Sequence, residues 1–80
     1  MPDDRRLKQI LRRVATAHEG ERNAITYWAS CRLAEMVTTG LISTNDATAY
    51  AIDAAMAAGL PRNEAINTVR SGLQQSGSRS

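Results

Sequence analysis

Residues 43–64 read STNDATAYAIDAAMAAGLPRNE, and this stretch decides the fold class. Ser43, with an acidic residue three positions later, is a variant of the capping box that begins a helix. The alanine-rich segment 47–58 ends at Gly59, where glycine takes the left-handed conformation that closes a helix. Pro61 then starts a further helix, because the first helical position needs no backbone N–H. The stretch therefore predicts two helices joined by a tight connection.

The remaining segments show the same helical spacing of apolar residues. We expect helices over about 4–18, from Glu21 or Arg22 to Thr38, over 47–58 and from Pro61 to near Gly72. Asp3 or Asp4 is expected to cap the first helix. Each of the four segments is followed by a glycine, at Gly20, Gly40, Gly59 and Gly72. The fold class is then all-α, a small bundle of four helices with short connections. Residues 1–73 form a single helical domain, and residues 74–80 form a flexible C-terminal tail.

The composition agrees with a small helical core. Thirteen of the 80 residues are alanine and only three are aromatic, which fits closely packed helices better than a sheet. Helical phase places Trp28 on the core side of its helix, with Ile25 and Met36, and leaves Tyr27 about 100° away and exposed. The phase of the next helix places Met56 toward the core.

Composition also excludes several functional classes. A single cysteine, Cys31, and a single histidine, His18, cannot form a disulfide within the chain or a conventional zinc site. The interpretation is that Cys31 packs as a small apolar residue and His18 as a boundary residue. No apolar run reaches a membrane-span length and the first residues are polar, so we expect a cytoplasmic protein. No catalytic residues, metal or cofactor are predicted.

The first helix carries the clearest candidate binding surface. Its basic residues are Arg5, Arg6, Lys8, Arg12 and Arg13, with no acidic residue between Arg5 and Arg13. Arginine is well suited to phosphate recognition. Tyr27 could add stacking on an unpaired base. These six residues form the predicted nucleic-acid-binding set, although an ordinary solvated helix face explains the same charges.

A second candidate is a helix-turn-helix formed by the last two helices. Ala55, Gly59 and Leu60 fit the alanine, glycine and apolar positions of that motif. The last helix would then offer Arg62, Asn63, Asn67 and Arg70 to the major groove. Two positions that should be apolar are Ala65 and Thr68, so the match is imperfect.

Two stretches together resemble the primase C-terminal (PriCT-like) domain of phage and plasmid replication primases. Residues 20–23, GERN, resemble the G-x-R-N signature that opens this domain, and residues 59–72, GLPRNEAINTVRSG, resemble its closing helix. The resemblance covers roughly residues 17–73. It implies a non-catalytic helical accessory domain that assists single-stranded template binding, with a primase catalytic domain or a helicase as its partner.

The residues of this resemblance also have a structural interpretation. Arg22 could pair with Glu64 while Asn23 caps backbone, so that Arg22, Asn23 and Glu64 form a clasp between the second and fourth helices. The sequence thus supports three functions. They are weak, sequence-independent binding of single-stranded DNA, specific duplex binding by the helix-turn-helix, and docking on a primase or helicase through an apolar patch of the alanine-rich third helix.

Overall fold

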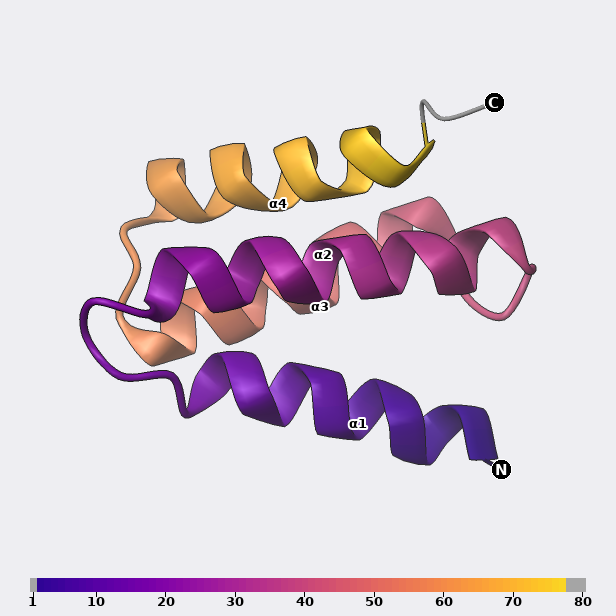
Figure 1. Cartoon of the computed structure of the whole chain (residues 1–80), viewed down its shortest axis with the longest axis horizontal. Helices are drawn as coiled ribbons and strands as arrows, with labels where there is room; N and C mark the ends of the chain where they lie inside the picture. Colours follow the sequence, from indigo (N-terminus) through magenta and orange to yellow (C-terminus); the bar gives the residue numbers. More distant parts are fainter. Residues whose placement is uncertain (1, 78–80) are drawn as a thin grey trace.

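The computed structural model describes the backbone of residues 2–77 and the side chains of residues 5–74. It contains α1 (Pro2–Ala15), α2 (Arg22–Thr38), α3 (Thr44–Ala58) and α4 (Arg62–Gly77), and no strand occurs in this part of the chain. The four helices run back and forth along the long axis of the molecule (Figure 1). The predicted all-α bundle of four helices with short connections is confirmed.

The local signals of the quoted stretch are formed as predicted. The Ser43 side chain caps α3 by accepting a hydrogen bond from the backbone N–H of Asp46, with 3.0 Å between the two atoms. Gly59 ends the same helix with a φ of 114°, in the left-handed region. The backbone oxygen of Pro61 accepts from the N–H of Ala65, so α4 begins one residue after the proline.

The first helix differs from the prediction at both ends. The first helix begins at Pro2 rather than near Asp4, because proline fits the first turn, where its missing N–H is not needed. It ends at Ala15 rather than His18, and both the backbone N–H and the hydroxyl of Thr16 donate to the backbone oxygen of Arg12. Asp3 and Asp4 therefore lie inside the helix, not at its cap.

The last helix is longer than predicted, since it continues past Gly72 to Gly77. Residues 74–77 of the predicted flexible tail are therefore helical. Residues 78–80 lie outside the described part of the chain. Gly72 is not a stop signal but a buried residue in the body of α4.

Helices α2 and α3 each pack against the other three helices. The closest partner of α2 is α4. Asn23, near the start of α2, contacts Thr68 of α4, and Cys31 contacts Gly72 further along both helices. Because the second contact lies closer to the C-terminal end of both helices than the first, α2 and α4 run parallel, as Figure 1 also shows. Small residues permit this close approach, since Ser30 and Gly72 meet at the contact.

The core is built from small side chains around α2. Val14, Leu33 and Val69 are the largest apolar side chains that are fully buried, and alanines from α2, α3 and α4 complete the packing. Trp28 and Met56, both predicted to face the core, are instead 39% and 40% exposed. Alanines already fill the positions where the helices touch, which leaves no room for these larger side chains.

Candidate nucleic-acid interface

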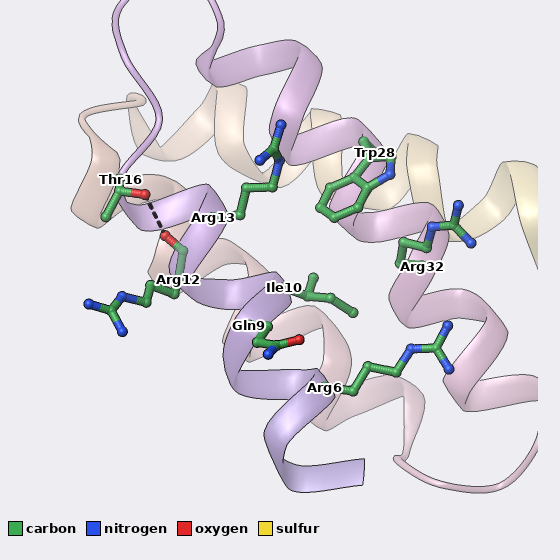
Figure 2. A pocket seen from close by; sticks show the side chains of 8 residues that line it. All are labelled: Arg6, Gln9, Ile10, Arg12, Arg13, Thr16, Trp28 and Arg32. Atoms are coloured by element: carbon green, nitrogen blue, oxygen red, sulfur yellow. Dashed lines mark hydrogen bonds between the residues drawn. The ribbon is translucent and has the colours of Figure 1, made fainter. Parts of the chain in front are cut away.

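An open hollow of about 740 Å³ lies between α1 and α2. Both helices contribute to its lining, which consists of Arg6, Gln9, Ile10, Arg12, Arg13, Thr16, Trp28 and Arg32 (Figure 2). Four of these eight residues are arginines and none is acidic. The hollow is therefore a positively charged surface with an aromatic ring beside it, a combination that also occurs in proteins that bind single-stranded nucleic acids.

Trp28 stands at the edge of this hollow instead of in the core. The guanidinium carbon of Arg13 lies 5.6 Å from the centre of its indole ring, a cation–π distance. Figure 2 shows the ring on α2 facing the side chains that come across from α1. An exposed aromatic therefore does lie beside the arginines. It is Trp28, however, and not the predicted Tyr27.

Tyr27 lies on another side of α2. It is 37% exposed, as predicted. However, it shares a face with Cys31 one turn later, and the Cys31 sulfur lies 3.6 Å from the backbone oxygen of Gly72 on α4. Tyr27 thus lies toward α4, whereas the basic residues are on α1. The structure does not bring Tyr27 together with them.

The basic residues of α1 divide into two sets. Arg6 and Arg13 extend toward α2, beside the buried Ile10 (Figure 2). The Arg12 side chain points away from Trp28 although the residue contributes to the lining. Arg5 and Lys8 are exposed and do not line the hollow. The predicted basic face is therefore not one surface, and only part of it faces the aromatic ring.

Arg32 is a lining residue that the sequence reasoning missed, because its helical phase groups it with the apolar face of α2. It lies one turn after Trp28, and Figure 2 shows its guanidinium on the same side as that of Arg6. Glu35 lies 3.3 Å away and forms an ion pair with it on the exposed surface. Such exposed pairs contribute little and leave Arg32 free to exchange partners.

The predicted clasp forms a contact between α2 and α4, but with different atoms. The amide nitrogen of Asn23 donates to Thr68 Oγ1 at 2.7 Å and to Glu64 Oε2 at 3.1 Å. Arg22 makes no ion pair with Glu64 in the described part of the chain, so that predicted pairing is wrong. Its guanidinium lies against Gly59 instead, where an added Cβ would sit 3.1 Å from Arg22 Cζ.

Asn23→Ala should lower the free energy of unfolding by about 1–2 kcal/mol, since it removes both hydrogen bonds and leaves the buried Thr68 hydroxyl without its donor. Urea unfolding followed by circular dichroism measures the change. The matched control is Asn67→Ala, an exposed position on α4. Equal stability of the two variants would show that the Asn23 bonds contribute nothing.

The alternative surface on α4 is also present. Arg62, Asn63, Asn67 and Arg70 are all exposed, and the imperfect motif positions Ala65 and Thr68 are buried. Figure 1 shows that α3 and α4 run in opposite directions along the long axis. The hollow between α1 and α2 is the stronger candidate because four arginines and an exposed aromatic ring line it.

Within residues 5–74, no three side chains of histidine, cysteine, aspartate or glutamate gather where they could hold a metal ion. Likewise, no helix over residues 2–77 combines the length and apolar character needed to cross a membrane. Comparison of the chain with models of protein families, with curated proteins and with solved structures finds no match.

Proposed function

We propose that this chain binds single-stranded DNA through the hollow between α1 and α2, as a non-catalytic accessory domain of a phage- or plasmid-type replication primase. The domain acts in the cytoplasm and holds template for a primase catalytic domain or a helicase. Its contribution is positioning, and sequence preference is not expected, because contacts to phosphate carry no sequence information.

One observation carries the binding proposal. Arg6 and Arg13 from α1 and Arg32 from α2 approach the same hollow, and no acidic residue lines it. Three guanidinium groups on two helices can contact successive phosphates of a nucleic-acid backbone. Glu35 forms an ion pair with Arg32, but both side chains are exposed, so a phosphate can replace the carboxylate. The groups are held by the packing of α1 on α2 rather than by a flexible tail.

The replication context rests on the resemblance of residues 20–23 and 59–72 to the primase C-terminal domain. Those two stretches contact each other through Asn23, which donates to two residues of the second stretch, and through Arg22, which lies against Gly59. A shared structural role explains why both stretches occur together. This contact supports the proposed family, and the binding site itself lies elsewhere on the domain.

The double variant Arg6→Gln/Arg13→Gln tests the site. Each lost phosphate contact reduces the slope of log affinity against log salt by about 0.7 for a single strand, so the slope should flatten by about 1.4. Fluorescence anisotropy of a labelled single strand at several salt concentrations measures it. The matched control is Arg5→Gln/Lys8→Gln, which removes the same charge from the same helix at two exposed positions that do not line the hollow.

The outcomes separate the proposed functions. Flattening by the first double variant alone supports the hollow, whereas equal flattening by both would assign binding to general charge on α1. An NMR titration completes the comparison. Amide shifts confined to residues 62–70 with duplex DNA would favour the helix-turn-helix. With no shift from either nucleic acid at low salt, the proposal fails and a protein partner becomes the better hypothesis, since Tyr50 and Met56 of α3 are exposed.

A further inference from the structure

Trp28 is a large aromatic residue that lies at the surface of α2 rather than in the core. It is the only tryptophan of the chain and its side chain is 39% exposed. Burial of so large an aromatic surface would normally stabilise a small domain. Here the ring is left at the edge of the hollow, with the buried Ile10 beneath and the Arg13 guanidinium over it.

We propose that Trp28 is the stacking platform for one unpaired base, and that Arg13 covers the ring only while the site is empty. On binding, the base replaces the guanidinium on the indole face and Arg13 turns to the adjoining phosphate. This inference rests on the proposed function and adds the residue that selects single strands over duplexes. A paired base is already stacked on its neighbours and cannot reach the ring.

The surrounding residues fit one nucleotide. The face of the indole is electron-rich, which is why a cation rests on it, and a base stacks there more strongly than an exposed cation does. Arg6 and Arg32 lie on the other side of the hollow from Arg13 (Figure 2), so phosphates on both sides of the stacked base have a guanidinium partner. Tyr27 lies away from the hollow, so one base is stacked per domain.

The first test needs no variant. A single tryptophan makes the intrinsic fluorescence a direct report from Trp28. Two probes are compared, an oligothymidylate of about ten nucleotides and an abasic strand with the same number of phosphates, within the length one small domain covers. The thymidylate should quench the fluorescence and bind about 5- to 150-fold more tightly, the range given by one base–aromatic stack.

A second test compares the same two strands on variants of Trp28. Trp28→Ala should bind the thymidylate and the abasic strand equally, because it has no ring on which a base can stack. Trp28→Phe keeps an aromatic face and should recover part of the difference. Affinities come from anisotropy of labelled strands, and circular dichroism confirms that each variant folds. Loss of the difference in Trp28→Ala, with partial recovery in Trp28→Phe, separates stacking from a merely structural role.

The failures of the two proposals are distinguishable. If the abasic strand binds the unaltered protein as tightly as the thymidylate, the stacking inference is wrong. Flattening of the salt dependence in Arg6→Gln/Arg13→Gln would still support phosphate binding by the hollow in that case. If neither strand binds at low salt, both proposals are wrong.

Discussion

Replacement of Gly72 by alanine will destabilise the protein by about 2 kcal/mol, which corresponds to a Tm lower by about 8–16 °C for a domain of this size. Helix propensity alone predicts the opposite, because alanine inside a helix is favoured over glycine by about 1 kcal/mol. The expected loss is therefore a net value. It is the steric cost of placing a side chain where α2 and α4 approach closely, minus the gain in helix propensity.

The reason is steric. A Cβ at position 72 would lie 2.5 Å from Ser30 Cβ and 2.9 Å from the backbone oxygen of Tyr27. Neither atom can turn away by a change of rotamer, since one is the first atom of its side chain and the other belongs to the backbone of α2. The two helices must move apart. That movement also loosens the Asn23 contacts with α4.

Urea unfolding of Gly72→Ala, followed by circular dichroism, measures the loss. Ser71→Ala is the matched control because Ser71 is the exposed neighbour on the same helix, where an alanine meets no obstacle. It should leave stability unchanged or raise it slightly. A Gly72→Ala variant as stable as Ser71→Ala would show that the helices tolerate a side chain at their contact.

The sequence predicts the parts of this fold that depend on neighbours in the chain. The Ser43 cap begins α3 and the left-handed Gly59 ends it. Both signals depend only on residues that are close in the chain, so they can be recognised in the sequence. Gly72 shows the limit of such reasoning. A stop glycine and a packing glycine look alike in sequence, and only the approach of Ser30 from another helix tells them apart.

The candidate site, like the fold, can be predicted from the sequence only in part. The arginines of α1 are visible in the sequence, but the side of the helix on which each lies relative to α2 depends on how the two helices are rotated against each other. That rotation places Arg13 over Trp28 and leaves Arg5 outside the hollow. The spacing of Trp28 predicts that it lies on the apolar face of its helix. Alanines fill the helix contacts and leave its ring at the surface.

Truncation of Leu33 to alanine should have the largest effect of all on stability. Among residues 5–74, Leu33 is the largest side chain that is fully buried, and it projects from α2, one of the two helices that pack against all the others. Deleting such a side chain typically costs about 2–5 kcal/mol through lost burial and the cavity left behind. A domain of 80 residues has about 4–12 kcal/mol in total.

The small core gives Leu33→Ala little means of recovery. Half or more of the buried core residues are alanines, whose side chains are too short to fill a cavity. We therefore expect broadened thermal unfolding and a Tm lower by about 8 °C or more, at about 4–8 °C per kcal/mol. Leu41→Ala makes the same chemical deletion at a side chain that is 47% exposed and should change the Tm by a few degrees at most. Similar losses at both positions would contradict a core centred on α2, because burial would then not decide what a leucine contributes.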